Sequence, residues 1–439
     1  MQNMTAAEMG RAIGAGTLDP VDLAQAYFAA IEAHPLSDRI YARLTKDRAM
    51  AEAHAARERA ASGYRVSPLD GVPISWKDLY DTAGTVTEAG TALLKGRVPS
   101  QDARVLRNAT LAGTVCLGKT HTSELAFSGL GLNPITATPP CVNDVNAVSG
   151  GSSSGAATSI AFGLAPVAIG TDTGGSVRIP AGWNDLVGLK TTSGQVSLEG
   201  VVPLCPQFDT VGPLAKTVED AALTYAVLAG CVPIDTAPTS IKGRKLAILE
   251  TVALDDLRDA PRAGFETAVA KFAEHGAQIE RITAPEVAVA LSLSATLFAP
   301  EAYGTWKDRI EAAPHLMFDK ILERFRGGAH VGAAEYVAGW QRLTVLRRIF
   351  SDRTAGYDGV ILPTAPILPP NIDRLLMDDV YYVEENLLAL RNTRIGNLMG
   401  SCAITLPTGV PSCGIMIMGQ PFGENQLLRL SLAAEAALA

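Results

Sequence analysis

Two stretches rich in serine and glycine carry the residues best suited to chemistry. The first, 149–155, reads SGGSSSG, and the second, 170–180, reads GTDTGGSVRIP. The sequence between them, 156–169, predicts a helix followed by a buried strand, so the two stretches are not linkers. Glycines beside a serine allow backbone N–H groups to approach a substrate closely. The pattern therefore favours a serine nucleophile over the plain alternative of two flexible loops.

No histidine lies near either stretch, but Lys77 lies upstream in an apolar segment with Val72, Ile74 and Trp76. Burial of a lysine lowers its pKa, because a low-dielectric environment disfavours the charged ammonium. A neutral lysine can act as a general base near pH 7. Serine with lysine is a known substitute for serine with histidine. The competing interpretation is a lysine at the end of a strand that reaches water or pairs with Asp78.

The motifs resemble those of the amidase signature family, the Ser–cis-Ser–Lys amidohydrolases. The spacing of Lys77, Ser152 and Ser176 is typical of that family. Further matching segments extend the resemblance over nearly the whole chain, at 71–78, 188–190, 209–214, 358–364 and 400–406.

The resemblance implies a triad in which Ser176 is the nucleophile that forms an acyl-enzyme. Ser152, which follows Gly151 through a cis peptide bond in the family, would relay a proton, and Lys77 would be the base. A hydroxyl group suits the middle position, because it can accept a hydrogen bond from one partner and donate to another.

Residues around the triad receive supporting roles from the same resemblance. The backbone N–H groups of Thr173, Gly174, Gly175 and Ser176 are expected to form an oxyanion hole, where a Cβ on the glycines would obstruct the substrate carbonyl. Asp172 and Arg178 are expected to brace this loop, and Ser153 to support it by hydrogen bonding. Contact of Arg178 with a substrate carboxylate is the alternative. Four residues are expected to line the substrate cleft: Ala126, Phe127, Ser128 and Gly129.

The sequence predicts an α/β fold in a single large domain, 1–439, with a central twisted mixed sheet covered by helices on both faces. Residues 1–65 are expected to form a helical N-terminal scaffold, and 70–230 the core that carries the motifs. Residues 286–350 are expected to form a variable helical region at the substrate cleft. Its apolar side chains, such as Leu297, Phe298 and Trp306, suggest an aromatic or aliphatic substrate.

Composition excludes two broad classes. The 439 residues are 47% hydrophobic, which is too apolar for a disordered chain. The net charge of −8 leaves no basic excess for general nucleic-acid binding. The sequence shows no run of 18 apolar residues and no signal peptide, so we expect a cytoplasmic protein with no membrane partner. Six scattered cysteines indicate reduced thiols, and no spacing of histidines or cysteines indicates a metal site.

Residues 113–120, GTVCLGKT, match the phosphate-loop pattern GxxxxGK[ST] letter for letter. A nucleotide-binding ATPase is therefore a rival hypothesis. A phosphate loop follows a strand and opens a helix. Here a helix is expected before the motif and a strand within it, so we interpret the match as a coincidence.

The resemblance implies hydrolysis of a carbon–nitrogen bond in a small-molecule amide, with aryl amides and carbamates as candidate substrates. It implies no metal and no organic cofactor, and it is compatible with a homodimer. The alternative function is the A-type glutaminase subunit of a tRNA-dependent amidotransferase. A third class, a binding protein with an idle triad, is disfavoured by the intact set of Lys77, Ser152 and Ser176.

Overall fold

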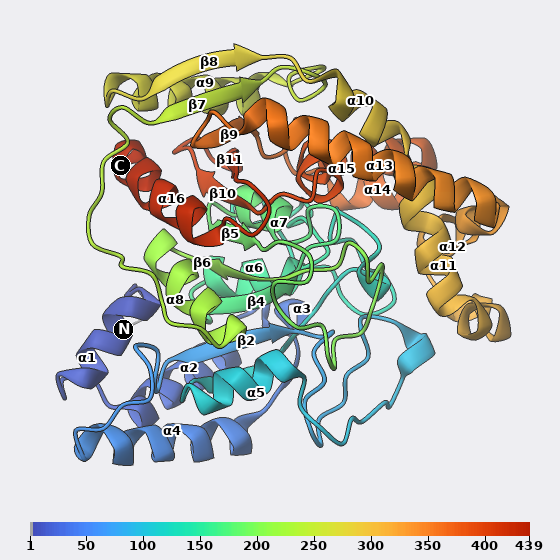
Figure 1. The fold of residues 1–439 in the computed structure, drawn as a ribbon. Coiled ribbons are helices and arrows are strands. Elements are labelled where there is room, and N and C mark those ends of the chain that lie inside the picture. Colours follow the sequence, from blue (N-terminus) through green and yellow to red (C-terminus); the bar gives the residue numbers. More distant parts are fainter. Residues whose placement is uncertain (1–2) are drawn as a thin grey trace.

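Eleven strands form one mixed sheet through the middle of the molecule (Figure 1). The computed structural model describes residues 3–439. The strand order is β1-β3-β2-β4-β6-β5-β10-β11-β9-β7-β8. The strands are β1 (Tyr41–Leu44), β2 (Pro73–Lys77), β3 (Val115–Thr120), β4 (Val167–Thr171), β5 (Val187–Lys190), β6 (Val211–Ala215), β7 (Lys245–Leu249), β8 (Gln278–Ile282), β9 (Gly359–Pro363), β10 (Ala403–Pro407) and β11 (Gly414–Met418).

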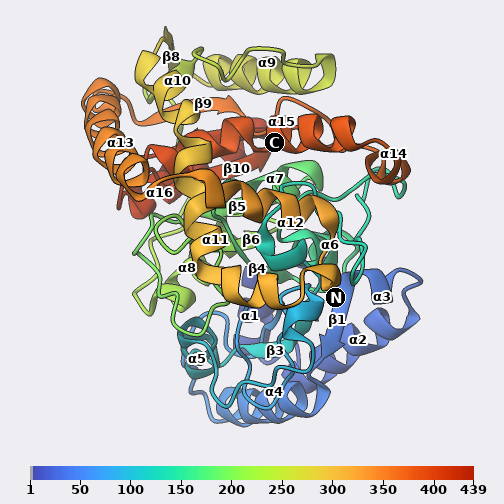
Figure 2. The same cartoon turned by 90° about the vertical axis from the view of Figure 1, so that its right-hand side faces the viewer.

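Helices surround the sheet, and those formed by the middle of the chain, α10 to α13, gather on one side of the molecule (Figure 2). The α-helices are α1 (Ala6–Gly14), α2 (Pro20–Ala33), α3 (Ser37–Ile40), α4 (Lys46–Ala61), α5 (Arg104–Leu111), α6 (Ser154–Ala161), α7 (Arg178–Trp183), α8 (Val218–Ala229), α9 (Asp259–Glu274), α10 (Pro285–Ser292), α11 (Ser294–Ala312), α12 (Asp319–Arg326), α13 (Ala333–Thr354), α14 (Ile372–Met377), α15 (Asp379–Leu398) and α16 (Glu424–Leu438). The short 3₁₀ helices are η1 (Ala92–Leu94), η2 (Glu124–Ala126), η3 (Pro314–Leu316) and η4 (Gly327–His330).

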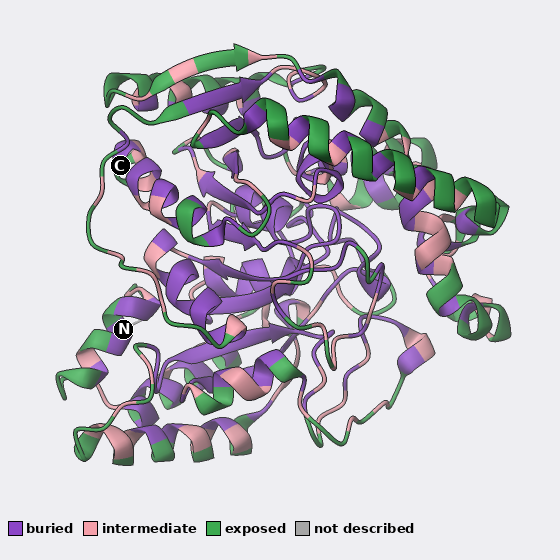
Figure 3. Ribbon diagram, viewed as in Figure 1, coloured by how far each residue is buried: buried purple, intermediate pink, exposed green. Residues whose placement is uncertain are grey.

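The sheet has an apolar core on each face, because successive residues of a strand point to opposite sides. In β11, Ile415 and Ile417 join a core with side chains of α8, α9 and α16. Met416 and Met418 join a second core with side chains of α10, α11 and α13. The central strands are buried, whereas the edge strand β8 and the outer sides of the helices face solvent (Figure 3). The prediction of a mixed sheet covered by helices on both faces is therefore confirmed.

Local sequence signals mark the ends of several helices. Thr5 and Glu8 form a reciprocal capping box at the start of α1. Asp19 caps α2, whose first residue is Pro20. Gly230 ends α8 in the left-handed conformation that glycine tolerates best. The strands β7 and β8, joined by α9, form a strand–helix–strand unit and pair in parallel.

The expected helical scaffold, 1–65, is wrong in one respect, because it contains the edge strand β1. This strand pairs antiparallel with β3, more than 70 positions later in the chain. The strands β5 and β6 and the long helix α15 were also not anticipated as elements. Each is held by partners that are distant in sequence, so a local pattern carries little of their signal.

One segment, Pro285–Ala312, is long and apolar enough to cross a membrane by length and composition alone. It consists of α10 and α11, with Pro300 inside α11. Its buried residues Val287, Leu297 and Phe298 belong to the second core of the sheet. A single segment of this kind is a weak indication, since helices of non-membrane proteins pass the same test.

Candidate active site

Lys77 is the last residue of β2 and is fully buried. Its neighbours Ile74 and Trp76 belong to the core on the opposite face of the sheet. The ammonium nitrogen donates hydrogen bonds to Ser152 Oγ at 2.6 Å and to Thr171 Oγ1 at 2.8 Å. Burial lowers the pKa of Lys77 to about 7, against the opposing charges of Asp209 and Asp172. The side chain is therefore placed to exchange protons near neutral pH.

Ser152 lies in the loop before α6 and follows Gly151 through a cis peptide bond. Its carbonyl oxygen accepts hydrogen bonds from Thr122 Oγ1 at 2.8 Å and from the Ser123 amide at 3.2 Å. These contacts hold the backbone of Ser152 in place. The side-chain oxygen remains available to Lys77.

Ser153 connects the two serine-rich stretches. Its amide donates to the Ser176 carbonyl at 3.2 Å, and its hydroxyl donates to the Thr171 carbonyl at 3.2 Å. The carbonyl of Ser176 is thereby held next to the loop that carries Ser152. Ser153 occupies the supporting position expected from the sequence.

Ser176 lies between β4 and α7 and lines a narrow pocket of about 20 Å³. Within residues 3–439 its hydroxyl forms no hydrogen bond, including none with Ser152. The structure brings Lys77 and Ser152 into contact but leaves the last link of the expected relay unformed. Catalytic hydrogen bonds are often loose before a substrate binds. The relay through Ser152 therefore stays a prediction.

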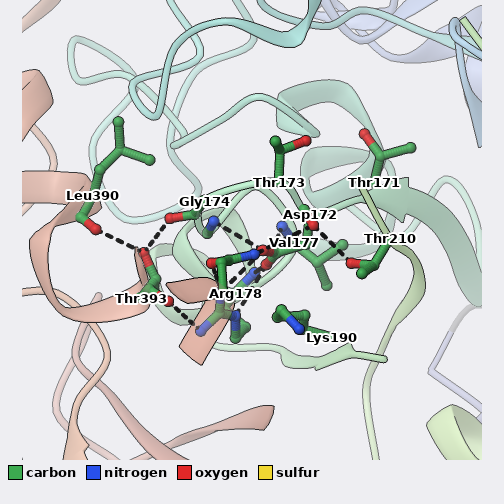
Figure 4. A network of polar contacts seen from close by, with 12 residues as sticks. Thr171, Asp172, Thr173, Gly174, Val177, Arg178, Lys190, Thr210, Leu390 and Thr393 are labelled. Carbon is green, nitrogen blue, oxygen red and sulfur yellow. Dashed lines mark hydrogen bonds and ion pairs between the residues drawn. The ribbon is translucent and has the colours of Figure 1, made fainter. Parts of the chain in front are cut away.

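Asp172 organises the loop that leads to Ser176 (Figure 4). Its carboxylate accepts hydrogen bonds from the amides of Gly175 at 2.8 Å and Val177 at 3.1 Å. It also forms a fully buried ion pair with Arg178 at 2.9 Å. Burial raises the pKa of Asp172, but the charge and hydrogen bonds of Arg178 outweigh it and lower that pKa to about 2. Asp172 and Arg178 lie where bracing residues were expected.

Helix α15 supplies partners that the sequence analysis did not find. Arg178 donates to the Thr393 carbonyl and to Asn397 Oδ1, each at 2.7 Å. Thr393 Oγ1 in turn donates to the Gly174 carbonyl at 2.8 Å. Figure 4 shows Arg178 between Asp172 and Thr393. No sequence signal near the motifs points to these residues, because α15 follows more than 200 positions later.

Only three of the four backbone amides expected in the oxyanion hole are free to bind a substrate oxygen. The Gly175 amide is already bound to Asp172, so it is not free for a substrate. The amides of Thr173, Gly174 and Ser176 have no acceptor within residues 3–439.

The role expected for the two glycines also needs correction. A Cβ at Gly175 would clash with Thr393 Oγ1 at 2.1 Å. A Cβ at Gly174 would lie 3.6 Å from the Leu390 side chain, which is an ordinary van der Waals contact. Close packing against α15 requires the second glycine.

Asp209 supports the same loop from another strand end. It accepts a 2.5 Å hydrogen bond from Thr173 Oγ1 and two backbone bonds from Leu204 and Cys205. Burial raises the pKa of Asp209, against these hydrogen bonds and the charge of Lys77. No ion pair within 4.0 Å joins Asp209 and Lys77 among the described salt bridges. Asp209 therefore influences Lys77 only at longer range.

Three of the four expected cleft residues line the pocket beside Ser176: Ala126, Phe127 and Ser128. Gly129 lies behind them, where its amide donates to Asn386 Oδ1 at 2.9 Å. A larger cavity of about 470 Å³ adjoins this pocket and shares Phe127, Phe298 and two arginines with it. In the expected cleft region 286–350, Phe298 lines both cavities, whereas Leu297 and Trp306 are packed in the core.

The phosphate-loop match does not form a phosphate loop. Its last six residues, Val115 to Thr120, form the buried strand β3. Lys119 is fully buried and pairs with Asp78 at 3.2 Å. It also donates to the Tyr80 carbonyl at 2.6 Å. The interpretation of residues 113–120 as a coincidence agrees with this arrangement.

Comparisons with known proteins agree with the motifs. A family model described as Amidase matches residues 22–428. A 2-amino-5-chloromuconic acid deaminase of Comamonas testosteroni is 35% identical over 389 residues, covering 85% of this chain and 83% of that protein. The A subunit of a glutamyl-tRNA(Gln) amidotransferase from Chloroflexus aggregans is 31% identical, covering 97% and 95% of the two chains.

The fold is shared as well. A solved structure described as an amidase superposes with a TM-score of 0.87 at 27% identity, covering 99% of this chain and all of that chain. The sequence match extends over the segments that hold Lys77, Ser152 and Ser176. The chain therefore belongs to the amidase signature family of enzymes that act on amide carbon–nitrogen bonds.

Proposed function

We propose that this protein hydrolyses a small-molecule amide through a seryl acyl-enzyme, with Ser176 as nucleophile, Ser152 as proton relay and Lys77 as base. The observation that carries the proposal is the contact between a fully buried Lys77 and Ser152, beside the pocket that Ser176 lines. A serine hydroxyl is a weak nucleophile unless a neighbour accepts its proton. A lysine with a pKa of about 7 can accept that proton at neutral pH.

In the first half of the reaction, Ser176 Oγ attacks the amide carbonyl carbon. Its proton passes to Ser152, which gives its own proton to the neutral Lys77. The carbonyl oxygen becomes an oxyanion that the free amides of Thr173, Gly174 and Ser176 can stabilise. The carbon–nitrogen bond then breaks as a proton returns through Ser152 to the leaving nitrogen. The products are a free amine or ammonia and an ester on Ser176.

In the second half, a water molecule attacks the ester carbon and loses its proton through Ser152 to Lys77. The bond between carbon and Ser176 Oγ breaks, and the proton returns to Ser176. A carboxylic acid leaves, and the enzyme regains its starting state. Removal of one oxyanion donor costs about 3–4 kcal/mol of transition-state stabilisation in comparable sites. The bracing of the loop by Asp172 therefore matters for rate.

The test is release of amine from primary amides, aryl amides and aryl carbamates by the wild type, Ser176→Ala and Ser100→Ala. Ser100 is an exposed serine and serves as the matched control. We expect turnover of at least one compound by the wild type and the control, and none by Ser176→Ala. Equal turnover by Ser176→Ala would overturn the mechanism.

The second candidate is a glutaminase subunit of a tRNA-dependent amidotransferase. It is favoured by the 31% identical amidotransferase relative, which aligns with almost the whole chain. Glutamine therefore belongs in the panel. Hydrolysis of glutamine that requires a co-purifying protein would support this candidate, whereas turnover of another amide by the isolated chain would support a free-standing hydrolase.

We also propose a cytoplasmic location and action without a metal or organic cofactor. All six cysteines are free thiols, five of them buried, which suits a reducing compartment. The expected homodimer stays a prediction. One relative is described as a deaminase of an amino acid derivative, 2-amino-5-chloromuconic acid. Removal of an amino group from such an acid is therefore a further reaction to test with the substrate panel.

A further inference from the structure

Two arginines line the catalytic pocket without a carboxylate partner among residues 3–439. Arg324 comes from α12 and Arg394 from α15, and each is half-buried. Both line the narrow pocket that Ser176 shares with Thr173 and Gly174. Both also line the adjoining cavity of about 470 Å³. They therefore lie where a substrate bound at Ser176 would extend.

The hydrogen-bonding groups of these arginines are largely unused. Arg324 donates one hydrogen bond, to the Phe127 carbonyl at 3.0 Å, and its guanidinium lies 4.3 Å from the centre of the Phe127 ring. Within residues 3–439, the side chain of Arg394 forms no hydrogen bond and no ion pair. Its guanidinium lies 5.8 Å from the centre of the Phe298 ring. A guanidinium has five N–H donors, so most donors of the pair have no protein acceptor at the cavities.

Nearby carboxylates do not neutralise the pair. Glu124 accepts from Thr91 Oγ1 and from the Phe318 amide. Asp209 accepts from Thr173 Oγ1. Glu323 lines the outer cavity but is exposed and forms no ion pair among the described residues. Arg178, the first residue of α7, shows the contrast, because it forms an ion pair with Asp172.

Two like charges that are partly removed from water destabilise each other. Burial lowers the pKa of Arg394, and the charge of Arg324 lowers it further. Burial also lowers the pKa of Arg324. Arginine stays protonated in proteins, so the site keeps two positive charges that an anion would neutralise. The planar guanidinium matches a carboxylate in a two-point contact.

We propose that the substrate of this enzyme is an amide that also carries a carboxylate, and that Arg324 and Arg394 bind this carboxylate. The inference rests on the proposed amide hydrolysis. The amide carbonyl lies in the narrow pocket at Ser176, and the carboxylate lies where that pocket meets the outer cavity. The chain between the two groups packs against Phe127 and Phe298. This assignment adds a carboxylate to the aromatic or aliphatic substrate suggested by the sequence of 286–350.

The test uses pairs of amides with the same chain length, of which one member ends in a carboxylate and the other in a methyl group. The pairs are succinamic acid with butanamide, glutaramic acid with pentanamide, and adipamic acid with hexanamide. We expect the wild type to prefer the acid in at least one pair by about 100-fold in kcat/KM. Equal values within every pair would overturn the proposal.

Variants assign the preference to the two arginines. We expect Arg394→Gln and Arg324→Gln each to reduce the ratio of kcat/KM for acid over neutral amide at least tenfold, mainly through KM. Arg394→Lys should recover part of the ratio, because it restores the charge without the planar geometry. Arg326→Gln is the control, since Arg326 lies on the same helix as Arg324 but pairs with Glu311 at the surface. An unchanged ratio in both glutamine variants would overturn the assignment.

A binding measurement separates this proposal from the proposed chemistry. Calorimetric titration of Ser176→Ala with the same acids and amides requires no turnover. Binding of the acids that weakens at least tenfold in Ser176→Ala/Arg394→Gln would support the carboxylate site, even if no compound were hydrolysed by the wild type. Equal binding of acids and neutral amides would refute it, even if neutral amides were hydrolysed.

Discussion

Lys77 and Lys119 lie on neighbouring strands, and both are fully buried, yet their surroundings differ. Lys119 on β3 contacts the carboxylate of Asp78 and the carbonyl of Tyr80. Lys77 on β2 contacts two hydroxyl groups, those of Ser152 and Thr171. Burial lowers the pKa of both lysines, but the adjacent carboxylate of Asp78 favours the charged form of Lys119. Burial alone therefore does not turn a lysine into a base. The group that contacts the ammonium, a carboxylate or a hydroxyl, decides how easily the lysine loses its proton.

The largest expected effect comes from Lys77→Met, which removes the base at similar volume. We expect kcat/KM to fall about 10²–10⁴-fold, the usual contribution of a general base. Stability should change little, because no carboxylate is left unpaired. The measurements are amine release and thermal unfolding. Activity of Lys77→Met within a few-fold of the wild type would contradict the assignment of Lys77, rather than Lys119, as the base.

The matched substitution Lys119→Met should lower stability and leave the activity of the folded protein unchanged. It leaves Asp78 buried without its nearest cation, although Arg43 remains at 3.4 Å. We expect a loss of about 3 kcal/mol of stability, seen as a lower denaturant midpoint. Activity per folded molecule should stay close to that of the wild type. Catalysis lost in a fully folded Lys119→Met protein would contradict the structural role of Lys119.

The pH profile follows from the pKa of Lys77. Below about pH 7 this lysine is protonated and cannot accept a proton, so kcat/KM should fall about tenfold per pH unit. Above that pH the lysine is neutral and the profile should level off. Initial rates with one substrate from pH 5 to 9 test this, with Lys119→Met expected to keep the same midpoint. A flat profile down to pH 5, with chemistry limiting the rate, would exclude Lys77 as the base.

The smallest effect is expected for Thr171→Val. Thr171 Oγ1 accepts a hydrogen bond from Lys77, and an acceptor stabilises the charged form of a lysine. Its removal should shift the acidic midpoint of the profile to lower pH. A change of about 1 kcal/mol in the hydrogen bond corresponds to a rate change of less than tenfold. A shift to higher pH would mean that the hydroxyl does not act on Lys77 in this way.

The sequence analysis predicted the features that depend on local pattern or on the family motifs. The mixed sheet covered by helices and the proximity of Lys77 to Ser152 are examples. It did not predict what the fold assembles from distant segments. The occupied amide of Gly175 follows from the carboxylate of Asp172, which only the folded loop reveals.

Arg394 shows the same limit at the substrate cavity. It lies far from every serine-rich motif in the sequence and reaches the pocket only because α15 packs across the loop of Ser176. An arginine in a helix ordinarily indicates an exposed, solvated face. That no carboxylate among residues 3–439 pairs with it is visible only when the surrounding side chains are in place.

The most direct test of the central claim is covalent labelling with a fluorophosphonate, followed by intact-mass and peptide mass spectrometry of the wild type, Ser176→Ala and Ser100→Ala. The account predicts one adduct per chain on Ser176 in the wild type and in Ser100→Ala, and none in Ser176→Ala. An adduct on another residue, or equal labelling of Ser176→Ala, would contradict Ser176 as the activated nucleophile.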